Sequence, residues 1–226
     1  MIKERYIEWL LRSGALQFGE FKTKSGRLSP YFFNTGHIDS GERLGAVSAL
    51  YAEAIGGRFG GGVDNLFGPA YKGIPLAVLT AYQLSLRLGR DISYTFNRKE
   101  AKDHGEGGDL VGRLYRGGEK VVIVEDVITG GTSFSEVLPL LARYKVEVIG
   151  AVVGVDRQER GTGTQSALRD IETKWQIPIV SLVTIQEVVD RLYQREVLGK
   201  VWINAAIKQR IDGYLATYAP ASATSP

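Results

Sequence analysis

The feature of the sequence that most restricts its fold is a series of largely apolar stretches separated by helical segments. Residues 121–124, 146–156 and 177–183 are rich in valine and isoleucine. The segments between them, 134–144 and 165–175, are expected to be helices. Strands that are apolar on both faces are typical of parallel sheets covered by helices on both sides. The sequence therefore predicts an α/β protein with a central, mostly parallel sheet flanked by helices.

The rest of the chain extends this alternation. A β-hairpin is expected within 15–34, because "KSG" at 24–26 is typical of a turn and apolar residues flank it. Residues 65–75 are expected to form a short strand and then a Gly/Pro loop that leads into a helix at about 74–88. A further strand is expected at 92–96, a polar loop at 97–109, and helices at 1–14, 42–56 and from about 184 to 217. Neither a repeat nor a linker interrupts the pattern. We expect a single domain over 1–226, with an N-terminal hood of about 1–35 and a disordered tail of about 219–226.

Composition limits the classes of function. The chain has 226 residues and a net charge of +3, from 28 basic and 25 acidic residues. This excess does not indicate nucleic-acid binding, although it suits small anionic ligands. The absence of cysteine excludes disulfides and thiolate metal sites, and two histidines cannot form a multi-histidine site.

Nothing in the sequence indicates a membrane protein. No stretch approaches the roughly 18–20 apolar residues that a membrane span needs. The N-terminal segment "MIKERYIEWLLRSG" mixes charged and apolar residues as an amphipathic helix does, unlike a signal peptide. A cytoplasmic location is therefore expected.

The segment "VVIVEDVITGGTS" (121–133) is the strongest candidate site. An apolar strand leads into Glu125 and Asp126, and a loop rich in glycine and hydroxyl groups follows before a helix that should start near residue 133 or 134. Backbone N–H groups at a helix N-terminus favour phosphate. Carboxylates beside a phosphate site suit the hydroxyl groups of a phosphorylated sugar, or a metal. The ordinary alternative is an acidic turn followed by a Ser/Thr helix cap.

Two better-known phosphate motifs are absent from this segment. A Walker loop requires G-x-x-x-x-G-K-[ST], and the loop contains no lysine. A dinucleotide fingerprint requires G-x-G-x-x-G after an early strand, and that spacing does not occur here.

This segment resembles the phosphoribosyl-diphosphate (PRPP) signature of the type I phosphoribosyltransferases. The resemblance implies the type I phosphoribosyltransferase fold. It also implies that Glu125 and Asp126 hold the ribose hydroxyls and that the following loop surrounds the 5-phosphate. Many relatives have Asp-Asp here, so Glu125 is a departure from the family pattern.

Four other segments resemble the orotate phosphoribosyltransferases of this family: 21–34, 67–77, 96–112 and 156–161. The resemblance implies that "GPAYKG" binds pyrophosphate, with a cis peptide bond at Ala70–Tyr71. It further implies that loop 97–109 is a lid completing the neighbouring subunit's site in a homodimer, where Lys102 and His104 act on the departing pyrophosphate.

The resemblance assigns site residues as follows. The implied catalytic residues are Lys102, His104 and Asp126. The implied PRPP-binding residues are Lys24, Tyr71, Lys72, Arg98, Lys99, Lys102, His104, Glu125, Asp126, Val127, Ile128, Thr129, Gly130, Gly131, Thr132 and Ser133. The implied orotate-binding residues are Lys24, Phe32, Phe33, Thr129 and Arg157. Taken singly, such cations are more often solvated surface residues, and two adjacent aromatic residues on a hairpin are usually core.

The function that this resemblance implies is transfer of the phosphoribosyl group from PRPP to N1 of orotate, giving orotidine 5′-monophosphate and pyrophosphate in UMP synthesis. Mg²⁺ is expected as cofactor, held mainly by PRPP, with no dedicated protein ligands. Two alternatives stay open: a PRPP-binding transcriptional regulator of the same fold, and a purine phosphoribosyltransferase.

Overall fold

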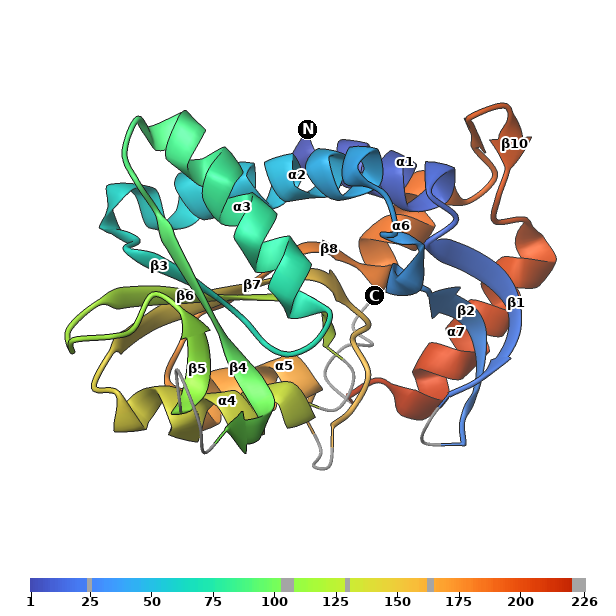
Figure 1. Ribbon diagram of the computed structural model, residues 1–226. Helices are drawn as coiled ribbons and strands as arrows, with labels where there is room; N and C mark the ends of the chain where they lie inside the picture. The colour runs from blue at the N-terminus through green and yellow to red at the C-terminus, as the bar shows by residue number, and fades with distance from the viewer. Residues whose placement is uncertain (24–25, 103–107, 129–130, 162–164, 221–226) are drawn as a thin grey trace.

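A six-stranded sheet forms the centre of the molecule (Figure 1). The computed structural model describes residues 1–226 except 24–25, 103–107, 129–130, 162–164 and 221–226. The sheet has the order β5-β4-β3-β6-β7-β8, and only β5 is antiparallel to its neighbour. The strands are β3 (Asn65–Gly68), β4 (Ser93–Lys102), β5 (Gly108–Gly112), β6 (Lys120–Ile128), β7 (Glu147–Asp156) and β8 (Ile179–Thr184). The predicted mostly parallel sheet is confirmed.

Helices cover both faces of the sheet, as Figure 1 shows. One face packs against α1 (Ile2–Arg12), α2 (Gly41–Phe59) and α3 (Gly73–Leu88), and the other against α4 (Thr132–Arg143) and α5 (Ala167–Trp175). Because helices cover both faces of the sheet, every residue in the middle of β6 is buried, and its sequence is apolar without alternation. Val122 and Val124 join the core on the first face, and Val121 and Ile123 join the core on the second.

Several helices begin at a side chain that caps a free backbone N–H group. The hydroxyl of Ser40 accepts from the backbone N–H of Arg43 at the start of α2. Thr184 forms a capping box with Glu187 at the start of α6 (Ile185–Leu192). Among the described residues, no helix is long and apolar enough to cross a membrane.

The predicted N-terminal hairpin is confirmed. Strands β1 (Leu16–Lys22) and β2 (Leu28–Phe33) pair antiparallel and form a separate two-stranded sheet. Helix α7 (Ala205–Tyr218), from the other end of the chain, packs against β2 (Figure 1). A short 3-10 turn, η1 (Thr35–His37), then leads from the hairpin towards α2; a second, η2 (Gly60–Gly62), precedes β3.

Two predicted segments are wrong in part. The predicted loop 97–109 is largely strand, because β4 continues to Lys102 and β5 begins at Gly108. Backbone pairing at a sheet edge needs no apolar alternation, and among the described residues of this hairpin only Leu110 belongs to a hydrophobic core. The predicted helical region 184–217 is interrupted by a small hairpin of β9 (Glu196–Val197) and β10 (Lys200–Val201), where Leu198 and Gly199 both have positive φ.

Candidate active site

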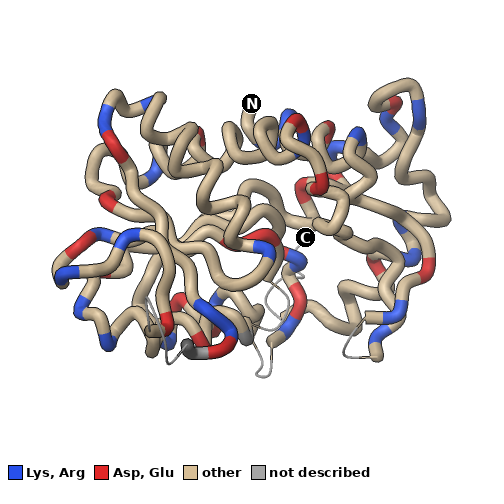
Figure 2. Tube along the Cα trace, in the orientation of Figure 1, with Lys and Arg blue, Asp and Glu red and all other residues tan. Residues whose placement is uncertain are grey.

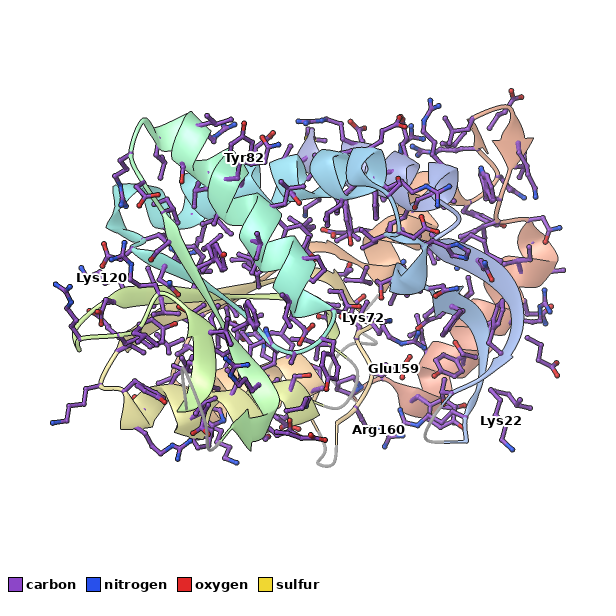
Figure 3. All side chains as sticks on the ribbon, in the orientation of Figure 1. Lys22, Lys72, Tyr82, Lys120, Glu159 and Arg160 are labelled. Carbon is purple, nitrogen blue, oxygen red and sulfur yellow. The ribbon has the colours of Figure 1, made fainter. Side chains whose placement is uncertain are left out.

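Strands β3, β6 and β7 run parallel, so their carboxyl ends meet at one edge of the sheet. This edge carries the β3–α3 loop, the Glu125–Asp126 pair of β6 and the segment that follows β7. In Figure 3, Lys72 and Glu159 lie in the region between this edge and the N-terminal hairpin. Described parts of four of the five segments singled out by the sequence, namely 21–34, 67–77, 121–133 and 156–161, therefore lie near this edge.

Asp126 is held from several directions. Its Oδ1 accepts from the backbone N–H of Val127 at 2.8 Å, and its Oδ2 accepts from the hydroxyl of Thr35. Lys72 Nζ lies 3.9 Å from the same Oδ2. The side chain is 14% exposed, so a ligand can still reach the carboxylate. Each carboxylate oxygen can accept a second hydrogen bond, which leaves Asp126 able to bind a hydroxyl group.

Glu125 is more deeply placed than Asp126, with 7% of its surface exposed. Burial raises the pKa of its carboxyl to about 8, and the charge of Asp126 adds to this shift. The hydroxyl of Tyr51 donates to the backbone carbonyl of Glu125 at 2.9 Å, from the α2 side of the sheet. A side chain at Gly154 on β7 would collide with the hydroxyls of Tyr6 and Tyr51, so this glycine makes room for the support beneath the acidic pair.

The strand prediction stops too early at Val124, because β6 continues through both acidic residues to Ile128. Glu125 pairs in register with Val153 of β7, and Ile128 is buried in the second core. Side chains of Val127 and Ile128 pack inward, so only their backbone groups could contact a phosphate.

Helix α4 starts one residue earlier than predicted, at Thr132. Gly131 is its N-cap, with φ of +72°, a conformation that favours glycine. Ser133 is exposed in the first turn of α4. Burial and the charge of Asp126 raise the pKa of Glu125, and a hydrogen bond from the hydroxyl of Ser133 partly offsets this rise. Thr129, Gly130 and the side chain of Thr132 lie outside the described residues.

The β3–α3 loop brings the backbone very close to the helix. A Cβ at Gly68 would lie 2.7 Å from the carbonyl carbon of Gly73, and one at Gly73 would lie 3.0 Å from the carbonyl oxygen of Val124. The expected cis peptide bond between Ala70 and Tyr71 is present. Asn97 of β4 accepts from the backbone N–H of Ala70 at 2.9 Å. Tyr71 and Lys72 extend into solvent, with Tyr71 72% exposed.

The cations of segment 97–109, which the sequence predicted to be a lid, have different surroundings. Lys99 pairs with Glu136 of α4 at 3.0 Å, which places β4 beside the first turns of that helix. Arg98 is partly buried, and its Nε has no hydrogen-bond partner among the described residues. The backbone of Lys102 ends β4, but its side chain is not described, and His104 and Lys24 lie outside the described residues.

The two aromatic residues of the hairpin face opposite ways, as neighbours on a strand must. Phe32 is 37% exposed and stacks on Phe21 with ring centroids 5.5 Å apart. Phe33 is buried in the core and meets Tyr31 edge to face. The side chains of Phe32 and Phe33 therefore cannot both line one ligand.

Arg157 is buried and already has partners. Its Nε donates to Oε1 of Glu159 at 2.8 Å, and its Nη2 donates to the hydroxyl of Ser29 at 3.2 Å. The guanidinium lies over the ring of Tyr31, 4.6 Å from its centre. Arg27 and the hydroxyl of Tyr31 also donate to Glu159. These contacts tie the hairpin to the segment after β7.

Sequence reasoning missed three residues that organise this site: Thr35, Asn97 and Glu159. Asn97 and Glu159 lie inside segments that the sequence had singled out, so their polar side chains at the ends of strands were a usable signal. Thr35 is 91 residues from its partner Asp126 in the chain, and nothing local in the sequence links them.

These features define the class of protein. A family model described as "Phosphoribosyl transferase domain" matches residues 36–177, which include the β3–α3 loop and the acidic pair of β6. The chain belongs to the phosphoribosyltransferase family.

Individual relatives identify the branch of that family. An orotate phosphoribosyltransferase of Lachnoclostridium phytofermentans is 49% identical over 217 residues, covering 96% of each chain. One from Bifidobacterium longum is 42% identical over 225 residues, covering 96% of this chain and 97% of the relative. The crystal structure of the Francisella tularensis orotate phosphoribosyltransferase has a TM-score of 0.79 at 32% identity, covering 95% of this chain and 98% of that one. Within the family, the chain belongs to the orotate phosphoribosyltransferases.

Proposed function

We propose that the protein transfers the 5-phosphoribosyl group of PRPP to N1 of orotate, producing orotidine 5′-monophosphate and pyrophosphate for UMP synthesis. The observation that carries this proposal is Asp126. A carboxylate held by Val127 and Thr35, yet open to solvent, suits the ribose hydroxyls of a phosphorylated sugar. Relatives that are 42–49% identical over nearly the whole chain have this activity in their names.

The donor is bound by groups from three segments in this proposal. The backbone N–H groups at the start of α4, with Ser133, receive the 5-phosphate at the positive end of the helix dipole. The exposed Lys72 and the backbone of the β3–α3 loop receive the pyrophosphate. Glu125, with a pKa near 8, is largely protonated at neutral pH and can donate a hydrogen bond to a ribose oxygen.

The lid residues act on the leaving group. Lys102 and His104 neutralise and protonate the departing pyrophosphate, and Arg98 and Lys99 contribute positive charge beside it. Closure over an oxocarbenium-like ribose keeps water from capturing it. Catalysis on this account comes from positioning and from stabilising developing charge.

The acceptor lies beside the hairpin. Phe32 supplies an apolar surface for the orotate ring, with Lys24 and Thr129 at its edges. Because Glu159 occupies one edge of the Arg157 guanidinium, Arg157 supports the orotate carboxylate only with the donors that Glu159 and Ser29 leave. Phe33 serves the site through its backbone and through the core beneath it.

Mg²⁺ enters with the substrate in this proposal. Magnesium commonly uses one or two carboxylates together with substrate phosphates. The described residues contain no group of three or more metal-ligating side chains, whereas the single carboxylate of Asp126 can be reached by a ligand. This donor set fits a cation carried by the pyrophosphate and ribose oxygens of PRPP, where it would neutralise charge on the leaving group.

A homodimer is the proposed catalytic unit, located in the cytoplasm. The β4–β5 hairpin lies at the edge of the sheet, where it is free to extend towards a neighbour. Helix α3, which carries Tyr82 (Figure 3), presents large apolar side chains to solvent. Tyr82 is 57% exposed and Leu86 is 65% exposed. Such a surface suits a second copy of the chain. Charges of both signs are spread along the chain (Figure 2), which does not favour nucleic acid as a partner.

A direct assay tests the function. Orotate absorbance is followed with PRPP and Mg²⁺, and adenine, hypoxanthine and uracil serve as alternative acceptors. We expect consumption of orotate alone, and strong loss of PRPP affinity in Asp126→Asn with the fold retained. Transfer to a purine would replace this proposal with a purine phosphoribosyltransferase. PRPP binding without turnover of any base would favour a regulator.

A further inference from the structure

Thr35 connects two charged groups of the site that come from different parts of the chain. Its hydroxyl donates to Oδ2 of Asp126 on β6 and accepts from Nζ of Lys72 at 2.8 Å. Thr35 is 8% exposed and stands directly after the aromatic hairpin, at the start of η1. The hydroxyl of Thr35 therefore links three parts of the site: the end of the β1–β2 hairpin, the β3–α3 loop and the acidic pair of β6.

The direction of these bonds is fixed by chemistry. An ammonium group only donates and an ionised carboxylate only accepts, so the hydroxyl must accept from Lys72 and donate to Asp126. Both bonds involve a charged group, and such bonds are shorter and stronger than neutral ones. Nζ of Lys72 and Oδ2 of Asp126 are 3.9 Å apart, which is too far for a hydrogen bond. The hydroxyl of Thr35 therefore bridges the two charged groups.

The two charged partners differ in freedom. The Lys72 side chain is 62% exposed, so it can turn towards an arriving pyrophosphate. The Asp126 side chain is 14% exposed and is held on Oδ1 by the Val127 N–H. When Lys72 leaves, Thr35 still donates to Oδ2, and the carboxylate keeps two of its three contacts.

We propose that Thr35 is a positioning residue of the transfer reaction: its hydroxyl holds Asp126 in the orientation that receives the ribose while Lys72 moves to the pyrophosphate. Thr35 would also make PRPP binding sensitive to orotate, because the hairpin that carries Phe32 leads directly into Thr35. This inference rests on the proposed function and adds to it a residue that touches neither reacting atom.

The test compares Thr35→Val with Thr35→Ser. Valine removes the hydroxyl at nearly constant volume, and serine restores it. Loss of a hydrogen bond to a charged group should weaken PRPP about tenfold or more in Thr35→Val. PRPP affinity is measured by calorimetry with Mg²⁺, and kcat and KM are measured for each substrate. We expect the KM for PRPP to rise far more than kcat falls, with Thr35→Ser close to wild type.

A matched control is Thr80→Val, since Thr80 on α3 is also buried but its hydroxyl has no hydrogen-bond partner among the described residues. It should leave PRPP affinity unchanged. In an Asp126→Ala background, adding Thr35→Val should cost no further affinity, because the carboxylate that Thr35 holds is gone. This cycle separates the contact from any general effect on folding.

The outcomes distinguish the inference from the function beneath it. Wild-type affinity in Thr35→Val, or equal losses in the valine and serine variants, would overturn the role of the hydroxyl and leave the proposed function standing. Additive losses in the Asp126→Ala background would also overturn it. A wild-type chain that neither binds PRPP nor consumes orotate would overturn both.

Discussion

Glu125 lies in an environment that differs strongly from that of a free glutamate side chain. A buried carboxyl beside Asp126 has its pKa raised to about 8 from an ordinary value of 4.5. The folded protein therefore keeps a proton that the unfolded chain releases as pH rises above about 4.5. The free energy of unfolding should fall between pH 5 and pH 8 through this group, and this contribution should be constant above its folded pKa.

Glu125→Gln should remove that dependence. Glutamine cannot ionise, so the loss of roughly 2–4 kcal/mol that Glu125 causes between pH 5 and 8 should disappear. Urea unfolding at pH 5, 6.5 and 8 measures it. The control is Glu20→Gln at an exposed position of β1, which should keep the wild-type slope. Identical slopes for wild type and Glu125→Gln would contradict the assignment.

Variants of Arg157 test whether this residue contributes both to the stability of the fold and to the binding of orotate. Arg157→Met leaves the buried carboxylate of Glu159 without its closest cation, and we expect a loss of about 3 kcal/mol in unfolding free energy. Adding Glu159→Gln should recover most of that stability, since no charge then remains buried.

The double variant also separates the two roles of Arg157. If Arg157 contacts orotate, the KM for orotate should stay high after stability is restored. Denaturant unfolding and steady-state kinetics of the three variants measure this. A double variant with the wild-type KM would make Arg157 purely structural.

At the scale of elements, the contact between β3 and α3 controls the position of the β3–α3 loop, which the proposed function assigns to pyrophosphate. A Cβ at Gly68 would lie 2.7 Å from the carbonyl carbon of Gly73 and 2.8 Å from Cβ of Ala77, and neither neighbour can rotate away. Gly68→Ala should therefore push α3 off the sheet, costing about 1–3 kcal/mol and weakening PRPP binding through Lys72.

Gly45→Ala is the matched control for that change. It lies within α2, and a Cβ added there would have no neighbour within 4 Å, so alanine should be neutral or slightly stabilising. Thermal unfolding and PRPP calorimetry compare the two variants. Unimpaired binding in Gly68→Ala would show that α3 can shift without disturbing the loop.

The same elements show what the sequence could and could not predict. Strand β6 was predictable because Val121 to Val124 face two cores and leave no polar alternation. The extension of β4 to Lys102 was not, because an edge hairpin can be held by backbone pairing alone. The hydrogen bond between Thr35 and Asp126 depends on how the hairpin packs against the sheet, and the spacing of these residues in the sequence could not predict that packing.

At the scale of the whole molecule, polar contacts join the hairpin to the sheet at the candidate site itself. Thr35 meets Asp126, Ser29 meets Arg157, and Tyr31 meets Glu159. In the proposed function, these contacts join the orotate side of the site to the PRPP side within one chain. The lid is the part that the proposal assigns to the neighbouring subunit, so a mixture of variants can test it.

Subunits carrying Lys102→Ala and subunits carrying Asp126→Asn should each be nearly inactive alone. If the lid of one subunit completes the site of the other, a mixed dimer contains one site with both native residues. Equal mixing followed by subunit exchange should restore about a quarter of wild-type activity, since about half the dimers are mixed and each has one intact site. Confirmed mixed dimers with no recovery would place the lid over its own subunit's site, because each chain then carries a defect in its only site.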